Sequence, residues 1–291
     1  MGLAQTKPHR AVALRRLTAM PLKPALSPLF KFKALAAAIR ITAVCGMIAP
    51  PAALAELSED SMIGPGLRTR PAYDGSASQR GELVPVIRYY GHPWFVRSTQ
   101  GVLEGGLRMA LAPELNAGAQ IAYEPGRKGR ESAFLKNHAV PDVDLGASVG
   151  VHLEWDHKFG RMPVTLLARA RQHTDTDRGA QIDFRLSAGV FQQGRFGAGV
   201  FTQAMWANAK SANSFYGITP ALSGPTRLPA FDPGSGWAYV SGGLLWSFDV
   251  SKQWIAVGNL EARRLQGDVA GSPLVERRSN YYATAGIAYR F

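Results

Sequence analysis

The chain has 291 residues, a formal net charge of +12 and one cysteine, Cys45, which excludes a small scaffold held together by disulfides. Most of the charge excess lies in residues 1–55, which hold eight of the 33 Lys and Arg and none of the 21 Asp and Glu. Residues 56–291 therefore carry 25 basic and 21 acidic side chains, a net charge of only +4, and we expect no nucleic-acid partner.

Residues 1–55 have the composition of a secretory signal peptide. A long basic segment is followed by the apolar run Ile41–Ala49 and by the small-residue pattern Ala53-Leu54-Ala55. The apolar run is too short to cross a membrane as a helix, which needs about 20 residues. We therefore expect a signal peptide at 1–55, with Met20 as an alternative start to the first residue, and one mature domain at 56–291.

Twelve segments of the mature chain alternate between apolar and polar residues with a period of two, which is the pattern of a β-strand. No helical periodicity competes with this pattern, so the sequence predicts an all-β fold. In chain order the segments are Ser61–Arg70, Glu82–Tyr90, Trp94–Glu104, Leu107–Leu111, Leu115–Glu124, Val143–Asp156, Val164–His173, Gln181–Phe191, Phe196–Ala207, Trp237–Phe248, Trp254–Arg264 and Tyr281–Phe291.

The segment Val143–Asp156 shows its two faces most clearly. Val149, Val151 and Leu153 share one face, and the other face carries His152 with charged neighbours. A soluble β-sandwich and a membrane barrel both predict such alternation. Three features favour the membrane barrel: segments of about 10 residues or more, aromatic residues near segment ends, and long polar loops that alternate with short turns.

These features predict a closed antiparallel transmembrane β-barrel in the outer membrane, with about 12 strands (10 to 12). Short turns are expected on the periplasmic side and longer loops on the external side, with both ends of the mature chain in the periplasm. The even count depends on the stretch Trp94–Leu111, which must form two strands that turn near Gly105-Gly106. If this stretch is one continuous strand, eleven strands remain and the topology fails.

The last segment, Tyr281–Phe291, predicts how the barrel is assembled. A terminal strand with aromatic residues at its last and third-last positions resembles the assembly signal of bacterial outer-membrane barrels. Thr284, Gly286, Tyr289 and Phe291 fit its spacing of polar, glycine, hydrophobic and hydrophobic residues. The resemblance implies that the barrel-assembly machinery is one partner of the chain and that outer-membrane lipid is another.

Several loops resemble those of the MipA/OmpV family of outer-membrane proteins. The segments that carry the resemblance are Pro71–Ser76, Phe215–Thr219, Pro229–Gly236, Gly267-Asp268 and Ser272–Glu276. One departure is Arg277-Arg278, where an acidic residue is more usual. The resemblance implies a non-enzymatic scaffold without cofactors that organises murein (peptidoglycan) synthesis and hydrolysis, with a lytic transglycosylase and a murein synthase as partners.

Charged residues on the polar faces of the segments are expected to line the barrel lumen and to pair with one another there. This lumen charge network would contain His152, Glu154, Asp156, Arg169, Arg171, Asp183, Arg185, Glu261 and Arg263. The two-residue spacing of the first three is also compatible with strand-borne metal ligands. A small-solute channel tuned by these charges is the first alternative to the scaffold function.

Two further candidate sites involve predicted external loops. Arg127, Lys128 and Arg130 are candidates for contact with the phosphates of lipopolysaccharide, and the alternative is an ordinary solvated loop. Ser132 and His138 on one loop, or His173 near Thr174, are candidates for a lipid-modifying enzyme, which is the second alternative function. No oxyanion hole or orienting acid stands at a recognisable spacing from them, so we expect that the protein is not an enzyme.

Overall fold

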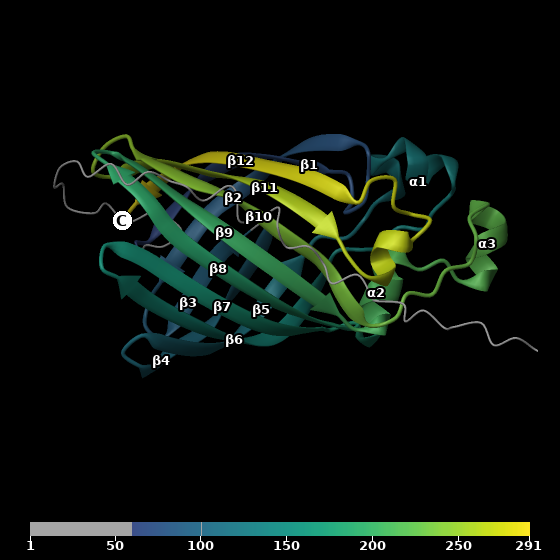
Figure 1. Cartoon of the computed structure of the whole chain (residues 1–291), viewed down its shortest axis with the longest axis horizontal. Coiled ribbons are helices and arrows are strands. Elements are labelled where there is room, and N and C mark those ends of the chain that lie inside the picture. Colours follow the sequence, from purple (N-terminus) through teal and green to yellow (C-terminus); the bar gives the residue numbers. More distant parts are fainter. Residues whose placement is uncertain (1–59, 100) are drawn as a thin grey trace, which may run out of the picture. The chain divides into compact units, whose positions relative to one another are not determined.

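The computed structural model describes residues 60–99 and 101–291 (Figure 1). In this part of the chain, twelve strands form one closed antiparallel β-barrel, as the period-two pattern predicts. The predicted signal peptide at 1–55 lies outside the described residues. None of the helices within residues 60–99 and 101–291 is long and apolar enough to cross a membrane.

The strands follow one another around the barrel wall in the order of the sequence. Their bounds are β1 Met62–Pro71, β2 Gln79–Tyr90, β3 Trp94–Thr99, β4 Val102–Ala112, β5 Leu115–Glu124, β6 Gly146–Phe159, β7 Met162–His173, β8 Ala180–Gln193, β9 Phe196–Ala207, β10 Gly236–Asp249, β11 Trp254–Leu265 and β12 Ser279–Arg290. The connections contain the helices α1 Ala133–Asn137, α2 Ala209–Tyr216 and α3 Pro220–Thr226, and the 3-10 turns η2 Gly129–Glu131, η3 Thr176–Arg178 and η4 Asp268–Gly271.

The last strand closes the barrel by pairing with the first. Met62 of β1 lies opposite Arg290 of β12, and Gly66 lies opposite Gly286, so both described chain ends are at the same end of the barrel. We call this the turn end, because its connections are the short segments 91–93, 113–114, 160–161, 194–195 and 250–253. The other end is the loop end, with the connections 72–78, 125–145, 174–179, 208–235 and 266–278 and the reversal between Thr99 and Val102.

The position predicted for the turn between β3 and β4 was wrong, although the strand count was right. The chain reverses between Thr99 and Val102, where Gly101 has a φ of +82° that favours glycine. Gly105 and Gly106 instead lie inside β4, opposite Val96 and Phe95. A Cβ added to Gly106 would collide with the carbonyl oxygen of Ala119 on β5, so this glycine permits close approach of two strands.

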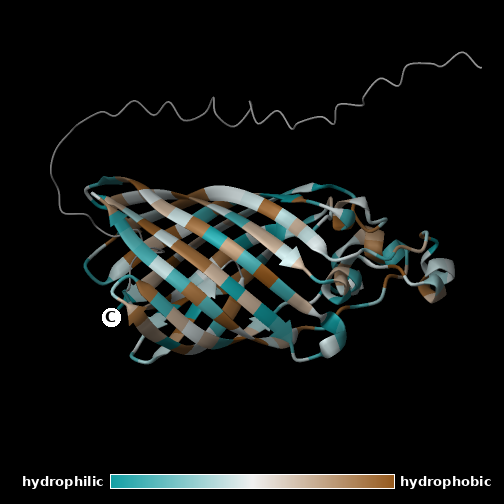
Figure 2. Cartoon of the chain, turned by 60° about the horizontal axis from the view of Figure 1, so that its bottom comes forward, coloured by the Kyte–Doolittle hydropathy of each residue, from teal (hydrophilic) through white to brown (hydrophobic). Residues whose placement is uncertain are grey.

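The barrel wall is apolar on its outer face and polar on its inner face, which is the reverse of a soluble protein. Apolar side chains such as Leu83, Val151 and Leu67 point outward and are 79%, 59% and 65% exposed. Charged side chains such as Glu104 and Asp183 point inward and are buried. Figure 2 shows hydrophobic and hydrophilic residues alternating along the strands. An apolar outer belt around a polar interior is the arrangement of a transmembrane barrel and not of a secreted sandwich.

Exposed aromatic residues mark both borders of this belt. Trp94, Phe159 and Trp254 lie near the turn end, and Trp237 and Tyr281 lie near the loop end. Trp and Tyr are favoured at the level of lipid headgroups because they combine an apolar ring with a polar N–H or O–H group. The two groups therefore mark the two membrane interfaces.

The long connections at the loop end pack together, and we call the packed segments 72–78, 125–145, 208–235 and 266–278 the loop cap (Figure 1). One hydrophobic cluster joins Tyr73, Leu135, Ile218 and Leu274, one residue from each segment. A second cluster packs Tyr216 of α2 with buried residues of β10, β11 and η4. The loop cap thus has a core of its own beyond the barrel.

Candidate functional site

The inner face of β3–β8 carries acidic and basic side chains in alternation around the wall. This arrangement follows from the period-two pattern, because every second residue of each strand must point into the lumen. The charges that meet there are Arg97, Glu104, Arg108, Glu124, Glu154, Asp156, Arg169, Arg171, His173 and Asp183. We call this set the ion-pair chain.

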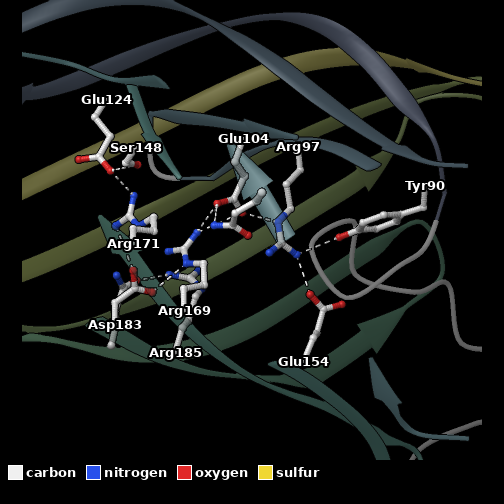
Figure 3. Close-up of polar contacts among 12 residues, drawn as sticks. Tyr90, Arg97, Glu104, Glu124, Ser148, Glu154, Arg169, Arg171, Asp183 and Arg185 are labelled. Atoms are coloured by element: carbon white, nitrogen blue, oxygen red, sulfur yellow. Dashed lines mark hydrogen bonds and ion pairs between the residues drawn. The ribbon is translucent and has the colours of Figure 1, made fainter. Parts of the chain in front are cut away.

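Arginines join successive carboxylates across the lumen (Figure 3). Arg97 donates to Glu104 Oε1 at 2.5 Å and to Glu154 Oε2 at 2.6 Å. Arg169 donates to Glu104 Oε2 at 3.0 Å and to Asp183 Oδ2 at 2.8 Å. Since each guanidinium serves two carboxylates, residues from different strands become one connected unit.

The same pattern continues at both ends of the ion-pair chain. Arg171 donates to Asp183 Oδ1 at 3.1 Å and to Glu124 Oε1 at 2.9 Å, and His173 Nε2 lies 3.4 Å from Glu124. At the other end, Arg108 donates to Glu154 Oε1 at 2.9 Å and to Asp156 Oδ2 at 3.4 Å. The paired groups therefore extend over the inner face from β3 to β8.

Most members of the ion-pair chain are shielded from water, whereas the side chain of Asp156 is 40% exposed. Asp183 is 0% exposed, Glu104 is 1% exposed and Arg169 is 4% exposed. Charged groups that leave water need partners, because the loss of hydration costs several kcal/mol per ion. The pairing thus explains why so many charges can be buried in a barrel of this size. It also means that these side chains occupy the part of the lumen beside β3–β8.

His152 lies within this packed region. The residue is 2% exposed, and its ring meets the ring of Phe95 edge to face at a centroid distance of 5.1 Å. Among the described residues, neither ring nitrogen has a hydrogen-bond partner. These residues also contain no group of three or more His, Cys, Asp or Glu that could hold a metal ion. His152, Glu154 and Asp156 therefore do not form the metal site that their spacing allowed.

A second charged cluster lies near the loop end. Arg263 donates to Asp74 Oδ2 at 2.7 Å and to Glu261 Oε1 at 3.0 Å, and the hydroxyl of Tyr282 donates to Asp74. Burial by itself would raise the pKa of Asp74, but the nearby Arg263 and Tyr282 hold it below its usual value. Asp74 thus ties the 72–78 connection of the loop cap to the inner face of β11 and β12.

Arg185 lies on the inner wall between these two groups. The strand register leads from Arg185 on β8 to Gln203, then to Ser241, and then to Arg263 on β11. The guanidinium of Arg185 stacks on Phe201 at 3.8 Å and donates to Gln203 Oε1 at 3.2 Å. The structure thus puts all nine predicted lumen residues inside the barrel.

The sequence analysis missed four members of the ion-pair chain on β3–β5, namely Arg97, Glu104, Arg108 and Glu124. Arg97 and Glu104 lie opposite each other in the β3–β4 hairpin. Placing a turn at Gly105-Gly106 puts these two residues on one strand and so hides their pairing. The sequence pattern that could have revealed them is the alternation itself, because these residues occupy the positions of each strand that point into the lumen.

The three predicted lipopolysaccharide contacts have different environments. Arg127 is 6% exposed and its guanidinium donates to the carbonyl oxygen of Phe215, so it belongs to the core of the loop cap. Lys128 pairs with Asp144 and lies 3.4 Å from Asp142. Arg130 is exposed. Arg127 is therefore unavailable to a lipid phosphate, and of the three only Arg130 still fits that prediction.

The candidate enzyme residues are used by the loop cap. His138 Nδ1 lies 2.8 Å from the carbonyl oxygen of Thr226, and Ser132 is 2% exposed. Burial raises the pKa of Tyr73 and of Tyr216 in the same region, which keeps both hydroxyls protonated. The Tyr73 hydroxyl donates to the carbonyl oxygen of Leu274 at 2.9 Å. His138 and Tyr73 thus hold loops together, whereas the Ser132 hydroxyl has no hydrogen-bond partner among the described residues, so Ser132 and His138 form no nucleophile–base pair.

The predicted assembly residues all lie on or next to the closing strand. Thr284 and Gly286 pair with Arg68 and Gly66 of β1. Tyr289 is 41% exposed, and its ring meets that of Trp254 at a centroid distance of 5.4 Å. Phe291 is 66% exposed at the turn end. The recognition of this strand by the assembly machinery remains a prediction.

Comparison with protein families identifies the chain. The sequence model of the family described as "MltA-interacting protein MipA" matches residues 63–291, which includes all of the barrel except the first residue of β1. The chain belongs to the MipA family. Together with its apolar outer belt, this makes it an outer-membrane β-barrel of that family. The family takes its name from an interaction with MltA and not from an enzymatic activity.

No curated protein matches this MipA-family chain. Among solved structures, the NanC porin is 10% identical, with coverage of 79% of this chain and 100% of the porin and a TM-score of 0.43. An outer-membrane channel from Pseudomonas putida is 10% identical, with coverage of 84% and 100% and a TM-score of 0.43. LpxR from Salmonella typhimurium is 8% identical, with coverage of 78% and 100% and a TM-score of 0.43.

Proposed function

We propose that this MipA-family barrel is a non-conducting, non-enzymatic scaffold that holds murein-processing enzymes at the outer membrane. Its direct partner would be an MltA-type lytic transglycosylase, and a murein synthase would join through that partner. The family name supports the first contact. The observation that carries the non-conducting part is the buried ion-pair chain across the lumen.

A solute channel needs a continuous path of water between its two mouths. The guanidiniums and the carboxylate that β3, β7 and β8 contribute to the ion-pair chain are 0% to 7% exposed, and the opposite charges of the chain neutralise each other. Charges that select ions in a pore must instead remain accessible to the permeating ion. The loop cap adds a second obstacle, because Tyr216 of α2 packs with the inward-facing Tyr239. Both features favour a plugged barrel.

A partner in the periplasm would meet the turn end, if the long loops face outward as the alternation of connections predicts. Exposed cations gather there: Lys158 lies at the end of β6, and Arg161, Arg195 and Lys252 lie in three consecutive turns. We call this set the basic arc. Within the described part of the chain, none of the four forms an ion pair with a carboxylate. An acidic surface on the transglycosylase would complement the basic arc and accelerate association.

The test is binding of a purified MltA-type lytic transglycosylase to the barrel in lipid nanodiscs. We expect saturable binding that weakens with salt, because complementary charges are screened. The triple variant Arg161→Glu, Arg195→Glu and Lys252→Glu should bind at least tenfold more weakly. A matched control moves the same charge change to exposed residues of the loop cap, with Arg130→Glu, Lys136→Glu and Arg227→Glu. The control should bind like the wild type.

Planar-bilayer recordings test the remaining part of the proposal. The purified barrel should show no steady conductance, since paired charges fill its lumen. Absence of transglycosylase binding by the wild-type barrel would contradict the scaffold function. A stable open conductance would favour the small-solute channel instead.

A further inference from the structure

A hollow of about 540 Å³ lies at the loop end, between the connections 208–235 and 266–278. Arg264 at the end of β11 and Arg278 just before β12 line it, together with Asp232, Asp268 and backbone of η4. Leu265 N donates to the carbonyl oxygen of Arg278 at 2.8 Å, so the two arginines come from segments that are hydrogen-bonded to each other.

Arg264 lies on the outer face of the barrel wall. Its cross-strand neighbour on β10 is Val240, which is 41% exposed, and two residues earlier on β11 Ala262 pairs with Tyr281, which is 65% exposed. An arginine on the lipid-facing side costs about 2–4 kcal/mol at the membrane centre and close to nothing at the interface. Arg264 therefore marks the level of the lipid headgroups, directly above the apolar belt.

Some polar groups of the hollow already have hydrogen-bond partners in the protein, and others do not. Asp232 Oδ1 accepts from Asn213 Nδ2 at 2.6 Å, and Asp268 Oδ2 accepts from Gly234 N at 3.1 Å. Arg278 uses its Nε to donate to the carbonyl oxygen of Ala270 at 3.0 Å, which fixes its position. Among the described residues, no carboxylate forms an ion pair with Arg264 or Arg278. The hollow thus presents two guanidinium groups that no carboxylate of the described chain neutralises and that can donate to a ligand.

We infer that this hollow binds a phosphate group of a membrane lipid, with Arg264 and Arg278 as the two anchoring residues. Guanidinium groups form paired hydrogen bonds with phosphate oxygens, and they do so most strongly where water is partly excluded. The acyl chains of the same lipid would lie on the apolar wall formed by Val240, Ala262 and Tyr281. This inference is independent of the scaffold function, because it concerns the other end of the barrel.

The experiment uses the full barrel purified from outer membranes and native mass spectrometry. The probe is lipid A that carries its phosphates, and the comparison lipid is the same lipid A after removal of the phosphates. We expect one tightly held lipid A per barrel. The variant Arg264→Gln with Arg278→Gln should hold it about tenfold more weakly, as expected for the loss of two charge-assisted hydrogen-bonding groups.

The matched control removes two other exposed arginines from the loop cap, with Arg130→Gln and Arg227→Gln. This control also tests the basic-loop hypothesis, because Arg130 belongs to the predicted lipopolysaccharide contact. Equal loss of lipid A in both double variants would overturn the inference, as would equal binding of the dephosphorylated lipid. Complete displacement of lipid A by millimolar inorganic phosphate would also overturn it, because the site would then belong to the free anion. Unchanged gel mobility before heating would show that each variant is folded.

Discussion

On β6, Val149 and Val151 of the outer face are 47% and 59% exposed, whereas Ser148 and His152 of the inner face are 1% and 2% exposed. The outer residues meet lipid, which requires only that they be apolar. The inner residues meet other side chains, and most of their charged groups have partners at defined positions, with the ring nitrogens of His152 as an exception. The hydroxyl of Ser148, for example, donates to Glu124 Oε1 at 2.7 Å. The residues allowed on the outer face are therefore set by the lipid around them, and those allowed on the inner face are set by the side chains with which they pair.

This difference predicts that the inner face is the less tolerant of the two. Arg169 bridges Glu104 and Asp183, so Arg169→Met would leave two buried carboxylates with fewer partners. The expected cost is about 3–5 kcal/mol in the free energy of unfolding, measured by urea titration of the barrel in lipid vesicles. The control Arg161→Met removes an exposed arginine of the turn end and should change stability by about 0.5 kcal/mol or less. Similar values for both variants would mean that the ion-pair chain is not a unit.

The outer face can be tested with a charge at mid-strand. Val149→Arg places a cation among lipid tails and should cost about 2–4 kcal/mol in the same measurement. Val149→Leu keeps the position apolar and should be close to neutral. If Val149→Arg is tolerated as well as Val149→Leu, the outer face of β6 does not contact lipid.

Ser148→Arg extends the same comparison to the neighbouring inner position. A water-filled lumen would accept the new side chain at little cost. Because Ser148 is 1% exposed beside Glu124, we expect a clear loss of stability instead. A neutral outcome would indicate a lumen wide enough for solute.

A smaller effect is expected where the inner face meets the loop cap. Asp74→Asn removes the carboxylate that accepts from Arg263 and Tyr282, and should cost roughly 1–2 kcal/mol at neutral pH. The pKa of Asp74 is lowered in the folded state, so its contribution is present above about pH 3.9, the usual value for Asp, and disappears as pH falls below it. The stability difference between wild type and Asp74→Asn should therefore shrink on acidification. A difference that grows below pH 4 would contradict the depressed pKa.

The smallest effect on stability is expected at the exposed end of the chain. Phe291 is 66% exposed, so Phe291→Ala removes little buried surface from the finished barrel. Its effect should be kinetic, because recognition of an unpaired terminal strand depends on backbone hydrogen bonds and on pockets for alternate side chains. Pulse-labelling should show slower conversion to the heat-modifiable form, with near-normal stability of the folded fraction. Assembly at the wild-type rate would exclude Phe291 from the assembly signal.

The accuracy of the sequence analysis follows the same division between the two faces. The alternation on β6, β8 and β12 predicted strands, an apolar outer belt and twelve strands, because a period of two is a local property. The site was predicted only by residue type. Glu154, Arg169 and Asp183 were assigned to the lumen, but their partners Arg97 and Glu104 were missed because the turn of the hairpin was placed at the wrong glycines. Arg127 was wrongly assigned to a lipid contact. Its burial depends on a loop-cap segment about 90 residues away in the sequence, which no local pattern indicates.

The sequence by itself determined the strands, the closed antiparallel architecture and the family, since these depend on local alternation and on short loop segments. Only the tertiary structure decided which charges meet. Arg97 reaches Glu154, and Tyr73 reaches Leu274, across 57 and 201 residues of sequence. The tertiary structure also decided that Arg264 and Arg278 lie together at the loop end without a carboxylate partner in the described part of the chain. The pairing of charged side chains depends on the register between strands and on the packing of distant loops. Neither of these can be read from a local pattern in one sequence.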